Sequence, residues 1–126
     1  MHHVIISIGS CFHAAAHVTW ASQLLSGMLS APCFSSTLWT RDHHGRPIYY
    51  MNRLVSGDTI LSEEQLTMIL KQAEGKTGRK AHHVTLDLDL LAYDNNLLHP
   101  SDWERDYVRR LLKDANLNKL AVPTTG

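Results

Sequence analysis

The chain has 126 residues, 44% of them apolar, which is enough to bury the core of a single domain over residues 1–126. Its formal net charge is zero and it has no run of ~18 apolar residues, so neither nucleic acid nor a membrane is expected as a partner. Cys11 and Cys33 form no CxxC pair, which disfavours a zinc knuckle or a disulfide framework and favours a reducing, cytoplasmic location.

The first half of the chain predicts one strand, one helix and two further strands. "HVIISIGS" predicts a strand that ends at Gly9, and a stripe of apolar residues predicts a helix from His17 to Leu29. "CFSSTLW" (residues 33–39) predicts the second strand, and "YYMNRLVSGDT" (residues 49–59) predicts the third. The polar segment "RDHHGRP" between them is expected to be a loop.

The second half predicts a helix, a strand and a last helix. Ser62 and Gln65 form a capping box that predicts a helix running to about Glu74, with Gly75 and Gly78 ending it. "VTLDLDLLAY" (residues 84–93) alternates as a fourth strand. A second capping box, made by Ser101 and Glu104, predicts the start of the last helix.

The order β-α-β-β-α-β predicts an α+β fold of the ferredoxin-like class. In this sandwich two helices cover one face of an antiparallel sheet and leave the other face open. The C-terminal helix is an addition to that arrangement.

Asp87 and Asp89 are expected on one face of the fourth strand, because side chains alternate along a strand. Two carboxylates at this spacing suit one or two hard divalent cations such as magnesium. The alternative is an acidic strand face in contact with water.

His99 and Arg105 flank the start of the predicted last helix, where both can meet an anion such as phosphate. The alternative is that Arg105 and Arg109 pair with Asp102 and Asp106 on a solvated helix face.

Two further features carry weaker signals. The basic loop with Lys76, Arg79 and Lys80 can bind phosphate or can simply be a soluble loop. Tyr50 and Asn52 alternate on the third strand, so they present an aromatic ring and an amide to one side.

Several motifs together resemble the 6-hydroxymethyl-7,8-dihydropterin pyrophosphokinase family, over roughly residues 4 to 112. They are "SIGS" (residues 7–10), "YMN" (residues 50–52), "TLDLDLL" (residues 85–91), and the spacing of His99, Arg105 and Tyr107. Members of this folate-biosynthesis family move a pyrophosphoryl group from ATP to a pterin alcohol and release AMP.

The resemblance implies a magnesium-dependent diphosphokinase with ATP as co-substrate, the pterin as acceptor and two Mg²⁺ ions. It implies that Tyr50 and Tyr107 sandwich the pterin ring and that Asn52 contacts its polar edge, with main-chain contacts from Thr40. The expected metal ligands are Asp87 and Asp89, and the expected catalytic residues are Asp87, Asp89, His99 and Arg105. The expected ATP-binding residues are Lys76, Arg79, Lys80, His99 and Arg105.

The sequence also departs from the family. The family usually has an arginine immediately before "TLDLD", where this chain has Val84, and a second arginine is missing from the short segment between Asp89 and His99. Phosphoryl transfer depends on positioning and charge neutralisation, so these losses predict an impaired enzyme. Two alternatives remain: a non-catalytic relative that binds a nucleotide or pterin, and a protein-interaction domain that keeps only the fold.

Overall fold

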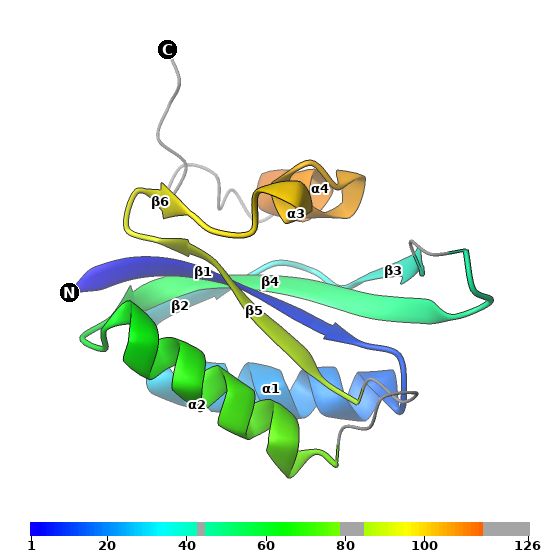
Figure 1. The fold of residues 1–126 in the computed structure, drawn as a ribbon, viewed down its shortest axis with the longest axis horizontal. Coiled ribbons are helices and arrows are strands. Elements are labelled where there is room, and N and C mark those ends of the chain that lie inside the picture. Colours follow the sequence, from blue (N-terminus) through cyan, green and yellow to red (C-terminus); the bar gives the residue numbers. More distant parts are fainter. Residues whose placement is uncertain (43–44, 79–84, 115–126) are drawn as a thin grey trace.

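The computed structural model describes residues 1–42, 45–78 and 85–114 (Figure 1). The chain runs in order through β1 (His2–Ser10), α1 (Ala14–Met28), β2 (Ser30–Phe34), β3 (Leu38–Arg41), β4 (Tyr49–Thr59), α2 (Glu63–Lys76), β5 (Asp87–Tyr93), β6 (Asn96–Leu97), α3 (Pro100–Trp103) and α4 (Asp106–Asp114). Within these residues no helix is long and apolar enough to cross a membrane.

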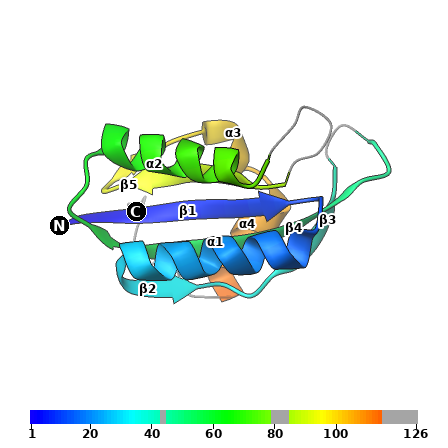
Figure 2. The same ribbon diagram turned by 90° about the horizontal axis from the view of Figure 1, so that it is seen from below.

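The strands form one antiparallel sheet in the order β2-β4-β1-β5-β6, and β3 also pairs with β4. The long strands β1 and β4 pair from His2 opposite Thr59 to Ser10 opposite Met51. Helices α1 and α2 lie side by side on one face of this sheet (Figure 2). The predicted α+β class with an antiparallel sheet is therefore confirmed.

The sheet is packed on both faces. On the α1–α2 face, the buried cluster includes Ile6 and Ile8 of β1, Leu25 of α1, Leu66 of α2 and Leu88 of β5. On the opposite face, a second cluster joins β1, β4 and β5 to α4; its buried members are Ile5, Leu54, Leu91, Ala92, Val108, Leu111 and Leu112. The expectation of an open face is thus wrong, because α4 lies over part of that face (Figure 1). Its apolar side chains belong to the second cluster.

The capping box at the start of α2 is confirmed. The Ser62 hydroxyl accepts a hydrogen bond from the Gln65 amide at 3.1 Å, and Gln65 Oε1 accepts one from the Ser62 amide at 2.9 Å. At the other end, Gly75 lies inside α2 instead of ending it, because the helix continues to Lys76.

The predicted second strand is divided into β2 and β3, both paired with β4. Ser35, which follows β2, explains how the chain stays attached between them. Its amide donates to the Leu54 carbonyl at 2.9 Å, and its hydroxyl accepts from the Leu54 amide at 2.8 Å. A side chain thereby replaces one backbone group of the ladder.

The predicted last helix is also divided, and its predicted capping box is wrong. The residue that precedes α3 is His99, which adopts a left-handed conformation with φ 51° and makes no side-chain cap. Trp103, at the end of α3, donates its indole N–H to the carbonyls of Leu91 at 3.0 Å and Leu98 at 2.9 Å. This contact with the sheet edge fixes α3 before the chain turns into α4.

Candidate active site

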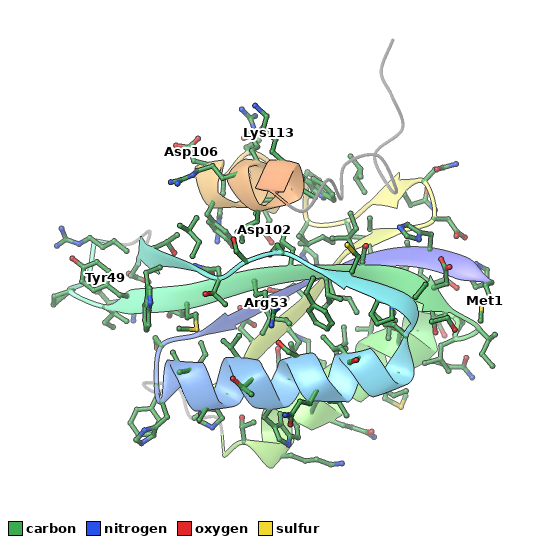
Figure 3. All side chains as sticks on the ribbon, turned by 180° about the vertical axis from the view of Figure 1, so that it is seen from behind. Met1, Tyr49, Arg53, Asp102, Asp106 and Lys113 are labelled. Carbon is green, nitrogen blue, oxygen red and sulfur yellow. The ribbon has the colours of Figure 1, made fainter. Side chains whose placement is uncertain are left out.

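A pocket of about 510 Å³ lies where the α3–α4 segment approaches the sheet. Its lining residues are Ser7, Gly9, Thr40, Arg41, Asp42, Arg46, Tyr50, Asn52, Asp87, Asp89, Asp102, Arg105, Asp106 and Tyr107. Asp102 lies between the helical segment and the sheet (Figure 3). The pocket therefore joins residues from β1, β3, β4 and β5 to residues near the C-terminal helix.

Gly9 lines the pocket from β1. In the sheet it lies opposite Asn52 of β4 on one side and opposite Asp87 of β5 on the other. A Cβ atom at this position would lie 3.6 Å from Asn52 Oδ1 and 4.0 Å from Asp87 Cβ. The missing side chain of Gly9 thus keeps open the space between an amide and a carboxylate.

Asn52 is held in a fixed orientation beside Thr40. The residue is only 5% exposed, and its Nδ2 donates to Thr40 Oγ1 at 2.7 Å and to the Leu38 carbonyl at 3.2 Å. These bonds occupy the NH₂ end of the amide and leave Oδ1 on the side of Gly9. A buried, oriented amide of this kind can distinguish ligands by their hydrogen-bonding edges.

Two tyrosines enter the same pocket from different elements, Tyr50 from β4 and Tyr107 from α4. Burial raises the pKa of both phenols; for Tyr107 the neighbouring Arg105 opposes that shift. Both phenols are therefore neutral near pH 7, so their rings present apolar faces for packing and their hydroxyls remain hydrogen-bond donors.

The charged groups of the pocket are mostly acidic, with five aspartates and three arginines in its lining. Arg46 holds the buried Asp42 through two hydrogen bonds of 3.0 Å. Arg105 Nη2 lies 3.3 Å from Asp102 Oδ1, so the alternative pairing of Arg105 with Asp102 is observed. This pair nevertheless lines the pocket and does not stand on a separate solvated face.

Asp87 and Asp89 both line the pocket and are both half-buried. Asp87 lies opposite Gly9 and Asp89 lies opposite Ser7, so both carboxylates are on the pocket side of β5. Among the described residues, no group of three or more His, Cys, Asp or Glu side chains is arranged to hold a metal ion. The oxygen donors nevertheless fit magnesium, which commonly takes one or two carboxylates and completes its shell with phosphate and water.

The remaining predicted residues lie outside this pocket. His99 is exposed and lines a neighbouring depression of about 340 Å³, which shares Asp89 with the main pocket. Lys76 is exposed at the end of α2 and lines neither hollow. Arg79, Lys80 and Val84 are outside the residues that the structure describes.

The comparison with protein families gives a match over residues 5–117, to the model described as 7,8-dihydro-6-hydroxymethylpterin-pyrophosphokinase (HPPK). The chain belongs to the HPPK family. The match covers most of the sequence and confirms the resemblance drawn from the motifs. None of the curated proteins matches the chain.

Sequence reasoning missed several residues of the HPPK pocket. Ser7 lines it from β1, and its position on the face of Gly9 follows from strand alternation. Arg41, Asp42 and Arg46 come from the segment "RDHHGRP", whose composition predicts only a polar loop. Their sequence spacing gave no signal, because the pairing of β3 with β4 brings them to the pocket.

Proposed function

We propose that this HPPK-family chain transfers the pyrophosphoryl group of ATP to 6-hydroxymethyl-7,8-dihydropterin and releases AMP. The observation that carries this proposal is the pocket itself. One hollow brings two tyrosines, an oriented amide, two carboxylates and Arg105 together from elements far apart in the sequence. A flat aromatic ligand and a metal-bound phosphate chain need this combination of groups.

In this proposal the pterin ring lies between Tyr50 and Tyr107. Both rings are neutral and partly buried, so stacking on a planar heterocycle is favourable. Asn52 Oδ1 accepts a hydrogen bond from the amino or ring N–H groups of the pterin, since the amide NH₂ is already engaged by Thr40. The main chain at Thr40 supplies further contacts at the edge of the ring.

The triphosphate of ATP lies near Asp89, where the main pocket meets the depression that contains His99. Asp87 and Asp89 would hold two Mg²⁺ ions, which would neutralise phosphate charge when bound. Arg105 contacts phosphate oxygens from the α4 side and His99 from the neighbouring hollow. Lys76, Arg79 and Lys80 are proposed as weaker phosphate contacts.

In the proposed reaction the pterin hydroxyl oxygen attacks the β-phosphorus of ATP. A new P–O bond forms, the bond between the β-phosphorus and the α,β-bridging oxygen breaks, and AMP leaves with that oxygen. The hydroxyl proton passes to water. The protein acts mainly by holding the two substrates in line, because tight positioning alone can lower such a barrier by about 7 to 11 kcal/mol.

A non-catalytic relative that binds a nucleotide or pterin is the second candidate. The acidic lining favours it, because two of the three arginines in the pocket are already bound to aspartates. The pairing of these arginines with aspartates, together with the loss of the two family arginines, also leads us to propose that the enzyme is impaired. The cytoplasmic location expected from the cysteine content is part of the same proposal.

Titration calorimetry separates the two candidates. The protein is titrated with ATP in the presence and absence of magnesium, and then with the pterin, and AMP is measured afterwards. The enzyme is expected to bind both ligands and release AMP. Binding without AMP would leave the non-catalytic relative, and a protein that binds neither ligand would overturn both.

A further inference from the structure

We infer that Asp102 is an internal competitor for Arg105, so that a phosphate group has to compete with the Asp102 carboxylate for the guanidinium. The inference rests on the proposed function, because it concerns the phosphate contact that Arg105 would make. It makes Asp102 a positioning residue that sets the affinity of the pocket for nucleotide.

The ion pair is built into the turn that joins α3 to α4. The Asp102 amide donates to the His99 carbonyl at 2.9 Å, and the Arg105 amide donates to the Asp102 carbonyl at 3.2 Å. These two backbone bonds fix both residues on one turn of chain. Their side chains then meet at 3.3 Å without contacts to any distant element being needed.

The pair lies inside the pocket and is only partly exposed. The side chain of Asp102 is 18% exposed and that of Arg105 is 36% exposed, and both residues line the main hollow. Figure 3 shows Asp102 beneath the helical segment, on the side of the sheet. An incoming anion therefore meets a guanidinium that already has a carboxylate partner.

Two effects oppose phosphate binding at Arg105. Separating the pair costs the energy of a partly exposed ion pair, and the freed Asp102 carboxylate then repels the phosphate. Any phosphate group that reaches Arg105, whether it belongs to ATP or to AMP, meets both effects. Asp102 thus lowers the affinity of the pocket for a nucleotide phosphate.

The test compares Asp102→Asn with the parent. Calorimetry measures the affinity of each protein, with magnesium present, for an ATP analogue that has a methylene bridge between its α and β phosphorus atoms. The variant is expected to bind about two- to fivefold more tightly, because a partly exposed ion pair is removed. It is also expected to bind AMP more tightly, and in turnover its KM for ATP should fall while kcat does not rise. A merely structural role for Asp102 would weaken binding.

Two matched controls isolate the pair. Glu104→Gln removes one negative charge next to Arg105 in sequence, but Glu104 does not line the pocket, so affinity should stay unchanged. In an Arg105→Gln background, Asp102→Asn should increase affinity by a different factor than in the parent, because the ion pair is absent there and only the repulsion between the carboxylate and phosphate is removed. Asp102→Ser is the second variant that removes the carboxylate if the asparagine variant melts early.

Weaker magnesium-dependent binding by folded Asp102→Asn would overturn the inference, since it would mean that Asp102 helps to hold the metal. An equal gain from Asp106→Asn, which also removes a pocket carboxylate, would overturn it by showing a general charge effect. Unchanged affinity in a parent that does bind the analogue would overturn this inference alone. A parent that binds no magnesium nucleotide would overturn the proposed function as well.

Discussion

Gly9 on β1 lies directly opposite Asp87 on β5, and a Cβ atom added at Gly9 would lie 4.0 Å from Asp87 Cβ. The same glycine lies opposite Asn52 on β4. The proposed metal-binding and pterin-binding sides of the pocket are therefore separated by the width of one strand. Any side chain at position 9 would project into the space between them.

Gly9→Val is expected to weaken pterin binding by at least about tenfold, because its methyl groups fill the hollow beyond the Cβ position. Gly9→Ala should bind almost normally, since its Cβ would meet its neighbours at ordinary distances of 3.6 and 4.0 Å. Fluorescence titration with the pterin measures both, and melting checks the fold. The control is Gly27→Ala on α1, where a Cβ meets nothing within 4 Å. Normal pterin affinity in folded Gly9→Val would place the pterin elsewhere.

Asn52→Ala is expected to weaken pterin binding by about 1 to 3 kcal/mol, because a polar edge of the ligand loses its hydrogen-bond partner. The affinity for ATP should stay unchanged. Thr40→Val keeps the amide but removes the hydroxyl that orients it at 2.7 Å, so it should cause a smaller loss of the same kind. Calorimetric titration of each ligand gives the comparison. Equal losses of affinity for the pterin and for ATP would show that Asn52 supports the fold and does not contact the pterin.

Glu74 is expected to stabilise the strand that carries the two proposed metal ligands. Its buried carboxylate accepts the Leu88 amide at 2.7 Å, between Asp87 and Asp89 in the chain. Glu74→Ala should lower the free energy of unfolding by about 1 to 3 kcal/mol, because that amide loses its partner, whereas Glu74→Gln keeps an acceptor and should cost less. Urea unfolding measures both, with the exposed Gln72→Ala on the same helix as control. Equal stability of Glu74→Ala and the control would show that the hydrogen bond contributes nothing.

Val84→Arg is expected to accelerate AMP formation by about tenfold or more, because one preorganised donor is worth a factor of this order or larger in transition-state stabilisation. The substitution restores the cation that the family resemblance expects before "TLDLD". Val84→Met adds comparable bulk without charge and should leave the rate near that of the parent. A folded arginine variant that is no faster than the methionine variant would show that charge at this position is not limiting.

The sequence predicted the fold class and much of the pocket because both depend on local patterns. The alternation of β4 and β5 places Asn52 and Asp87 on one face, and the capping box of α2 is a local hydrogen-bond pattern. The division at Ser35 was not predictable from alternation, since it depends on the bonds between Ser35 and the distant Leu54.

The pocket residues that were missed depend on tertiary pairing in the same way. The division after α3 follows from the contact of Trp103 with the Leu91 and Leu98 carbonyls, which no capping rule contains. The spacing of Asp102 and Arg105 allows their ion pair, which the structure contains. Its position in the pocket follows only from where α3 and α4 meet the sheet.

The most direct test of the account measures AMP after ATP, magnesium and 6-hydroxymethyl-7,8-dihydropterin are mixed with the parent protein and with Asp87→Asn and Asp89→Asn. Asparagine keeps the size of each side chain but removes the charge that a divalent cation requires. We expect the parent to form AMP and the pterin diphosphate in equal amounts, and both folded variants to form neither. No AMP from a parent saturated with both substrates, or undiminished AMP from the two variants, would contradict the proposed reaction at this site.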